Sequence, residues 1–170
     1  GPLEREVRVA IVRVDPEGAQ AQDTIVFGNI ARMESRILPE LDRGAIWIAS
    51  PSTKAQLLQL SVIIGQGGER VPVLQEQSGT WKLLGRPLFF SEHLPALGTK
   101  GDLILTNLSA YALGLRKEIA VDRSNSAYWS TDEVGFRAVL RCDGMSKLDR
   151  VITPSNGGDS LSWCVMIADR

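Results

Sequence analysis

Residues 84–95 read LGRPLFFSEHLP, and this stretch decides how the rest of the chain is interpreted. Gly85 and Pro87 form a turn signal in front of an apolar run. Pro95 ends that run, because proline has no N–H to donate to a sheet ladder. The run therefore predicts a strand. Further strands are predicted downstream, at residues 102–107, 116–121 and 136–144.

In the first half of the chain, segments with the residue pattern of strands alternate with a segment that has the residue spacing of a helix. Residues 7–14 are rich in β-branched side chains and end at Asp15, which predicts a strand closed by a turn. From Asp23 the apolar spacing becomes helical, with Asp23 as the expected N-cap. Residues 45–49 are wholly apolar, which predicts a strand covered on both faces.

The next segments predict a helix, a loop and a returning strand. A second helix is expected over residues 50–64, with Ser50 as its N-cap. The glycine-rich segment 65–79 predicts an exposed loop or hairpin. Residues 161–167 predict a last strand, for which residues 7–14 are the obvious neighbour. Two distant parts of the chain would then share one sheet.

Composition bounds the class of protein. A chain of 170 residues is long enough for one domain with a sizeable core. Its 19 lysines and arginines nearly balance 20 acidic residues, so bulk charge predicts neither a nucleic acid nor a membrane as partner. No apolar run approaches the roughly 18 residues that span a bilayer. Cys142 and Cys164 lie in apolar strand-like contexts, which predicts two buried thiols rather than a disulfide framework.

The order of these signals resembles the C-terminal half of the major capsid proteins of tailed phages, of the Hong Kong 97 type. In that family a Gly-x-Pro strand leads to a Ser-Glu-x-x-Pro segment, filled here by Gly85, Pro87, Ser91, Glu92 and Pro95. The family's next strand ends in Gly-Asp, and this chain departs from the pattern with Thr106-Asn107. The later matches are Tyr111, Arg116, Ile119-Ala120-Val121, Trp129, Asp132, Arg141, Asp143 and Gly144.

The resemblance implies an α+β fold with a central mixed sheet flanked by helices, which is the axial domain of such proteins. We expect residues 5–22 to form a strand and turn of the peripheral domain, residues 23–145 the axial domain, and residues 146–170 a strand returning to the peripheral domain. Residues 1–4 begin Gly-Pro without a methionine, which suggests a tag remnant or a processed start. We therefore expect the family's N-terminal arm, extended hairpin loop and spine helix to be absent here.

The resemblance also implies a structural protein rather than an enzyme. Such subunits self-assemble through pentamers and hexamers into an icosahedral shell around double-stranded DNA, with a scaffolding protein or a maturation protease as possible partners of the full-length protein. We expect no cofactor, no metal, no membrane and no sequence-specific nucleic-acid recognition. The expected location is the virion capsid, and the host cytoplasm during assembly. An encapsulin-type nanocompartment shell, which encloses cargo enzymes, resembles the same fold and stays an alternative.

Two groups of residues are predicted subunit contacts under this interpretation. The first belongs to the glycine-rich segment, expected to meet its copies at a five- or six-fold axis: Gln66, Glu69, Arg70, Gln75 and Glu76. The second is expected to make flank contacts: Arg116, Arg137 and Arg141. Arg137 and Arg141 share one face of a period-two strand.

Other chemistry has weak support. Ser91, His93 and Asp102 could be imagined as a hydrolase triad, but no Gly-x-Ser-x-Gly elbow occurs in the sequence. Cys142, Cys164 and His93 lack the close-spaced pairs of a structural zinc site. A monomeric ligand-binding module is a third interpretation, and it predicts one deep apolar pocket.

Overall fold

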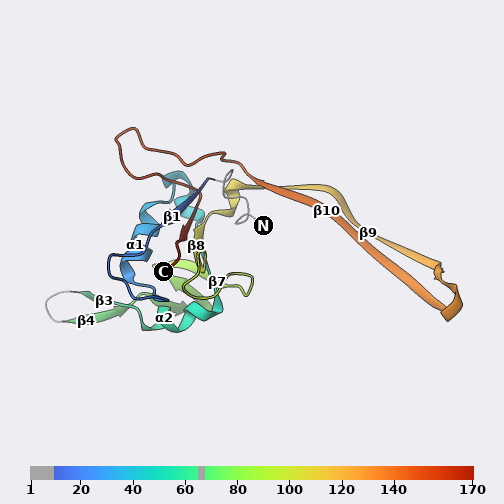
Figure 1. Cartoon of the computed structure of the whole chain (residues 1–170), viewed down its shortest axis with the longest axis horizontal. Coiled ribbons are helices and arrows are strands. Elements are labelled where there is room, and N and C mark those ends of the chain that lie inside the picture. The colour runs from blue at the N-terminus through green and yellow to red at the C-terminus, as the bar shows by residue number, and fades with distance from the viewer. Residues whose placement is uncertain (1–9, 65–67) are drawn as a thin grey trace. The chain divides into compact units, whose positions relative to one another are not determined.

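The computed structural model describes residues 10–64 and 68–170, and these form two compact units (Figure 1). One unit contains the described residues up to Ala110 together with Leu148–Arg170. The other unit is the segment Tyr111–Lys147. The axial and peripheral boundaries expected from the sequence stay predictions.

The first unit is built on a seven-stranded mixed sheet with the order β1-β11-β8-β2-β7-β6-β5. The pairs β1–β11 and β2–β7 are parallel, and the other neighbouring pairs are antiparallel. This is the central mixed sheet predicted from the sequence. Its strands are β1 (Ile11–Val14), β2 (Ile46–Ala49), β5 (Leu74–Gln77), β6 (Thr80–Leu83), β7 (Arg86–Phe90), β8 (Leu103–Thr106) and β11 (Cys164–Ile167).

The predicted partnership between the two ends of the chain is confirmed. Ile11 of β1 lies opposite Cys164 of β11, and Val14 lies opposite Ile167, in parallel register. The prediction began this strand at residue 7, and residues 7–9 lie outside the described part of the chain. Strands about 150 residues apart in the sequence are therefore neighbours in one sheet.

The core of the sheet follows the apolar runs read from the sequence. All four residues of β8 are buried, with Leu103 and Leu105 fully so. In β2, Trp47 and Ala49 are fully buried while Ile46 and Ile48 are half-buried, so one face is more deeply covered than the other. These strands lie at the middle of the sheet, where neighbours on both sides shield them.

Helix α1 (Phe27–Ser35) begins later than predicted. Asp23 is not its cap: it has a left-handed φ of 54°, and the N-cap is Val26. The Val26 N–H donates instead to Asn29 Oδ1 at 3.1 Å. Ile30 and Met33, which follow the helical apolar spacing, have no exposed surface. α1 packs against β1 and β11.

The second predicted helix is wrong over its last part. A 3-10 turn, η2 (Pro51–Thr53), leads into α2 (Lys54–Gln59), and strand β3 (Ser61–Ile64) follows directly. Ser50 makes no side-chain cap; its Oγ lies 3.0 Å from Ser52 Oγ. Val-Ile-Ile is a β-branched run that favours a strand over a helix, and this preference prevails over the helical spacing.

The predicted loop 65–79 contains two strands, β4 (Glu69–Pro72) and β5 (Leu74–Gln77). β3 pairs with β4 (Glu69–Pro72) as a separate two-stranded sheet, which agrees with the hairpin alternative. Beyond Val73 the chain enters β5, the edge strand of the main sheet. Gln66 lies outside the described residues. The other short helical turns of the chain are η1 (Pro39–Gly44), η3 (Leu108–Ala110) and η4 (Trp129–Thr131).

The second unit is a long antiparallel hairpin of β9 (Tyr111–Tyr128) and β10 (Glu133–Ser146). The predicted strands 116–121 and 136–144 are confirmed as strands, and each is part of a longer one. Both belong to this two-stranded sheet and have no place in the seven-stranded one.

Candidate interaction surfaces

The two faces of the β9–β10 hairpin differ sharply in chemistry. Phe136 lies opposite Arg123, and Ala138 opposite Val121. Because side chains alternate along a strand, every second pair lies on this face. We call it the apolar face, and its large side chains are between 50% and 72% exposed: Leu113, Leu115, Ile119, Val121, Phe136 and Leu140.

Bulges in β9 keep these side chains together. The register shifts between Val139 and Arg141, and again between Arg141 and Cys142. Each shift inserts one extra residue in β9, so the two together restore the original alternation. Leu113 and Leu115 consequently face the same way as Ile119 and Val121. The alternation of side chains along β9 and its two bulges together keep these apolar side chains on one face.

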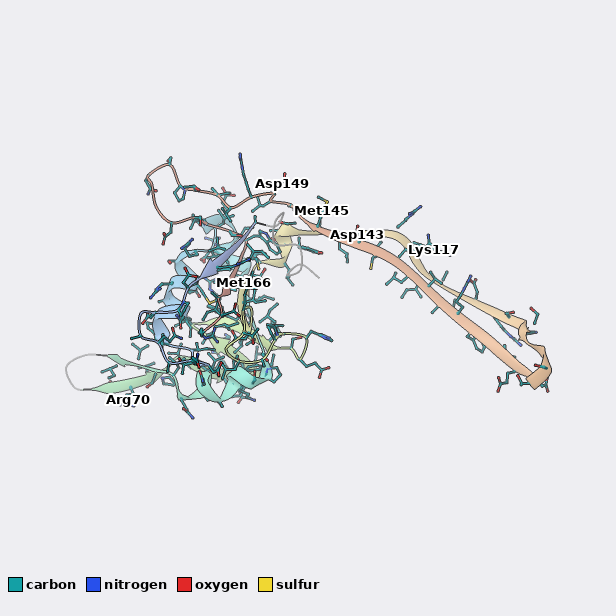
Figure 2. The ribbon with its side chains drawn as sticks, viewed as in Figure 1. Arg70, Lys117, Asp143, Met145, Asp149 and Met166 are labelled. Carbon is teal, nitrogen blue, oxygen red and sulfur yellow. The ribbon has the colours of Figure 1, made fainter. Side chains whose placement is uncertain are left out.

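The opposite face is polar and carries two of the predicted contact residues. Arg137 donates to Asp122 Oδ2 at 3.0 Å, and both side chains are largely exposed. Arg141 lies four residues after Arg137 on β10, opposite Lys117, and the extra residues of the nearby bulges are on β9. Arg137 and Arg141 are therefore on the same face of β10. The shared face predicted for these arginines therefore follows from the register. Figure 2 shows Lys117, Asp143 and Met145 along this hairpin.

Arg116 is exposed, and no residue of β10 pairs with it in the register. It is thus one of the bulge residues of β9. The hairpin brings all three predicted arginines into one element, while their role as flank contacts stays a prediction.

The other predicted contacts lie on the first unit. Glu69 and Arg70 are exposed on β4, and Figure 2 shows Arg70 on the β3–β4 hairpin. Gln75 and Glu76 are exposed on β5, at the edge of the seven-stranded sheet. An edge strand with polar side chains is protected from uncontrolled strand pairing, yet its free backbone groups can meet another surface.

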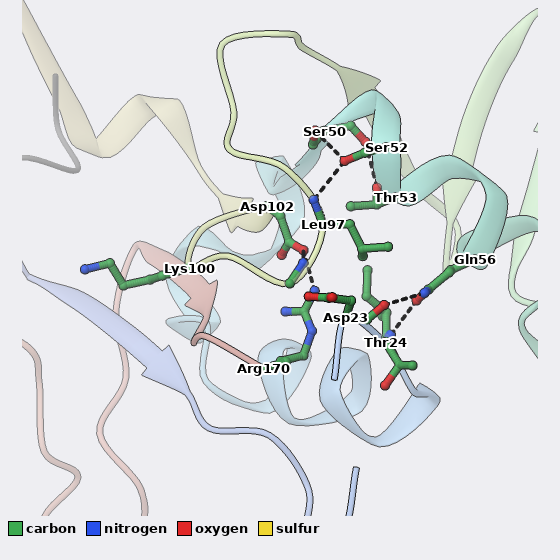
Figure 3. Close-up of polar contacts among 12 residues, drawn as sticks. Asp23, Thr24, Ser50, Ser52, Thr53, Gln56, Leu97, Lys100, Asp102 and Arg170 are labelled. Carbon is green, nitrogen blue, oxygen red and sulfur yellow. Dashed lines mark hydrogen bonds and ion pairs between the residues drawn. The ribbon is translucent and has the colours of Figure 1, made fainter. Parts of the chain in front are cut away.

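Asp102 has a structural role in the described chain. Its side chain is fully buried and forms an ion pair with the fully buried guanidinium of Arg170. Figure 3 shows Asp102 and Arg170 together. Asp102 Oδ2 also accepts the Gly98 N–H at 2.9 Å, and the backbone N–H of Arg170 donates to the Gly98 carbonyl. These contacts fasten the chain end to the β7–β8 loop.

The imagined triad of Ser91, His93 and Asp102 gains no support from these contacts. Ser91 Oγ accepts the backbone N–H of His93 at 3.3 Å, which is a local turn bond. His93 is exposed, whereas Asp102 is buried against Arg170. In a triad the carboxylate instead bonds to the imidazole and orients it.

The two cysteines have different environments. Cys164 is buried, as predicted, and burial raises the pKa of its thiol to about 12. The prediction for Cys142 is wrong, because it is exposed on the apolar face opposite Leu115. A two-stranded sheet has no second layer to cover such a side chain.

Arg86 is a structural residue that sequence reasoning did not single out. It donates to Glu34 at 2.8 Å and to both the carbonyl and Oδ1 of Asp42 at 2.5 Å. Burial lowers the pKa of Arg86, but hydrogen bonds and charges from the two carboxylates outweigh that effect and raise it above its ordinary value. Arg86, on β7, therefore links this strand to α1 and η1. Its position between Gly85 and Pro87 is the sequence feature that could have drawn attention to it.

A hollow in the first unit offers little to a ligand. It is lined by side chains that include Gln20, Gln56 and Leu60. Gln56 accepts the Ile25 N–H and donates to the Asp23 carbonyl (Figure 3), while Gln20 bonds to Glu17 and Thr24 in the same way. The amides hold the chain before α1 in place.

Within residues 10–64 and 68–170, no group of three or more His, Cys, Asp and Glu side chains is placed to hold a metal ion. None of the helices in the described part of the chain combines the length and the apolar character needed to cross a membrane.

The fold of this chain is shared with solved capsid structures. The chain is similar to the "capsid of empty GTA particle", with a TM-score of 0.61 and 14% identity over 94% of this chain and 47% of that one. It is also similar to the "capsid of native GTA particle", with a TM-score of 0.59 and 13% identity over 92% of this chain and 52% of that one. The chain thus spans about half the length of the capsid chains it matches. Among curated proteins, no match was found.

The class defined by this fold is therefore a phage-type capsid protein, with a mixed sheet as its core. The sequence model described as "Phage capsid family" matches residues 6–154. The chain belongs to the phage capsid family. The resemblance read from the sequence is thereby confirmed.

Proposed function

We propose that this chain is part of a shell subunit that associates with copies of itself into an icosahedral capsid around double-stranded DNA. The observation that carries the proposal is the family match over residues 6–154, joined to a fold shared with particle capsids computed with C5 symmetry. Five-fold symmetry requires that one surface of a subunit meets a different surface of its neighbour, and many modest contacts then add up around the ring.

The β3–β4 hairpin and the β5 edge are the surfaces proposed for contacts at a symmetry axis. Glu69 and Arg70 are adjacent, exposed and opposite in charge, so neighbouring copies around an axis can pair them between subunits. Exposed pairs of this kind contribute little energy singly, about 0–1 kcal/mol, and act mainly on specificity. Arg116, Arg137 and Arg141 are proposed to make flank contacts from the hairpin.

The test is disulfide trapping between copies at the β3–β4 hairpin. In a Cys142→Ser background, Glu69→Cys leaves one exposed engineered thiol per chain and should give a disulfide-linked dimer on a non-reducing gel under mild oxidation and molecular crowding. Glu40→Cys, an exposed acidic position in η1, is the matched control and should give none. A Glu69→Cys protein that stays monomeric wherever the control does would contradict the proposed axis contact.

The content of any particles distinguishes the proposed capsid from an encapsulin. Particles recovered from expressing cells should retain DNA that resists nuclease digestion. Particles that hold protein cargo and no protected DNA would overturn the phage-type function and favour the nanocompartment.

A further inference from the structure

Residues 153–160 form a turn whose ends are held together. Ile152 and Leu161 pair as an antiparallel bridge, and their backbone groups exchange hydrogen bonds of 2.9 and 2.7 Å. Between these two residues, the side chains of residues 155–159 are all exposed. The turn is therefore open to water although both of its ends are anchored.

The dipeptide Asn156-Gly157 lies at the centre of this turn. The Gly157 N–H donates to the Pro154 carbonyl at 3.1 Å, which closes a β-turn. Gly157 has a left-handed φ of 77°, and it carries no side chain that would hinder an approach to its backbone nitrogen. The Gly158 N–H donates to Asn156 Oδ1 at 3.2 Å. The Asn156 amide is thus held in the turn by its oxygen.

We propose that Asn156 is a site of spontaneous deamidation in the folded chain. The backbone nitrogen of Gly157 loses its proton to water and forms a bond with Asn156 Cγ, which closes a succinimide ring. The bond between Cγ and Nδ2 breaks, and Nδ2 takes up a proton from water and leaves as ammonia. Water then adds to one of the two ring carbonyls and opens the ring, which gives aspartate or isoaspartate.

The two hydrogen bonds of the turn act on this reaction in opposite directions. Negative charge develops on Asn156 Oδ1 when Cγ is attacked, and the Gly158 N–H that already points at this oxygen stabilises it. The bond from Gly157 to Pro154 opposes the reaction, because this N–H must first be released. Backbone hydrogen bonds in exposed loops open at little cost in free energy. The fold should therefore slow the reaction without preventing it.

The other three asparagines of the chain lack one or more of these features. Asn29 and Asn107 are buried, and both side chains bond to backbone groups of the core. Asn125 is exposed like Asn156, but it precedes Ser126, whose side chain crowds the attacking nitrogen. Asn125 is therefore an internal control for the effect of the glycine.

The products change the turn and leave its anchors in place. Both products add a negative charge, and isoaspartate also adds one carbon to the backbone, so the bond from Gly157 to Pro154 should be lost. Arg36 holds the far end of the turn, since it donates to the Ser160 carbonyl at 2.6 Å and pairs with Asp159 at 3.3 Å. The modified chain should consequently keep its fold.

Peptide mapping by mass spectrometry tests the proposal on the 170-residue chain after prolonged incubation. Asn156 should lose its amide at least about tenfold faster than Asn125, a difference of about 1.4 kcal/mol in activation free energy. An isoaspartyl methyltransferase should label the same peptide. Circular dichroism before and after incubation should show the same sheet content.

Gly157→Ser is the matched variant, because it gives residue 156 the same following residue as Asn125. Nothing lies within 4 Å of a Cβ added at Gly157, so the new side chain meets no other group. This variant should deamidate at residue 156 about as slowly as at Asn125. Asn156→Gln should remove the acidic species that ion-exchange chromatography resolves in the incubated chain.

Two results would overturn the proposal. An Asn156 that keeps its amide in the folded chain while the urea-unfolded chain loses it would show that the turn protects the site. Equal rates at Asn156 and Asn125, or an undiminished rate in Gly157→Ser, would show that the glycine and the turn have no part in the reaction. Neither result bears on assembly, so the proposed function is tested separately by the Glu69→Cys dimer.

Discussion

The seven-stranded sheet and the β9–β10 hairpin use their apolar residues in opposite ways. Trp47, Leu103 and Leu105 in the sheet are fully buried by neighbouring strands and by α1 and α2. In the hairpin, residues of the same kind such as Leu113 and Phe136 face solvent. The sheet supplies its own core, while the described residues leave the apolar side chains on one face of the hairpin exposed.

The largest effect expected from this contrast comes from truncating one buried and one exposed aromatic side chain. Trp47→Ala should lower the free energy of unfolding by about 3–5 kcal/mol, because it removes a fully buried side chain and leaves a cavity. Phe136→Ala, at a residue 72% exposed, should change it by less than about 0.5 kcal/mol in the monomer. Urea unfolding followed by circular dichroism at low protein concentration measures both. Equal costs would show that the hairpin has a core of its own.

The buried ion pair that fastens the chain end should give the next largest effect. Asp102→Asn keeps the shape of the side chain but leaves the buried Arg170 charge without its partner, at a cost of about 3 kcal/mol. Adding Arg170→Met removes the unpaired buried charge and should recover part of the lost free energy of unfolding. A double variant no more stable than Asp102→Asn alone would contradict a charge origin of the cost.

Alkaline pH should weaken the sheet through Cys164. The pKa of its thiol in the folded chain is about 12, against 9.0 for an ordinary thiol, so the unfolded chain loses its proton first as pH rises. The stabilisation is fully present below pH 9 and is lost between about pH 9 and 12. Cys164→Ala should flatten this part of the stability–pH curve, although it lowers stability at neutral pH.

The smallest effect is expected at the polar face of the hairpin. Arg137→Ala removes an ion pair whose two side chains are 75% and 56% exposed, and solvent screening leaves such pairs within about 0.5 kcal/mol. Thermal unfolding of the monomer should therefore be almost unchanged. A loss above about 1 kcal/mol would mean that this face is covered as well.

Much of the sheet could be predicted from local patterns. β7, β8 and β2 follow apolar runs bounded by Gly and Pro, and the pairing of β1 with β11 followed from two strand-like ends that needed partners. The end of α2 could not be located by apolar spacing, because residues 57–64 fit a helical stripe as well as a helix followed by a strand. The β-branched run Val-Ile-Ile was the better signal.

The candidate surfaces were harder to predict, since exposure depends on what lies next to a strand. Cys142 and Ile119 occupy strand-like contexts that look like core in the sequence. Only the topology reveals that their sheet has two strands and no covering layer. The alternation of Leu113, Leu115, Ile119 and Val121 could have indicated a one-sided apolar strand.

Hydrogen–deuterium exchange in dilute protein tests the central claim most directly. The account predicts that amides of β2, β8 and β11 are protected, while those of β9 and β10 exchange fast because the described residues leave one face of the hairpin uncovered. Protection of the hairpin equal to that of the seven-stranded sheet would contradict the account, because the hairpin would then have a core of its own.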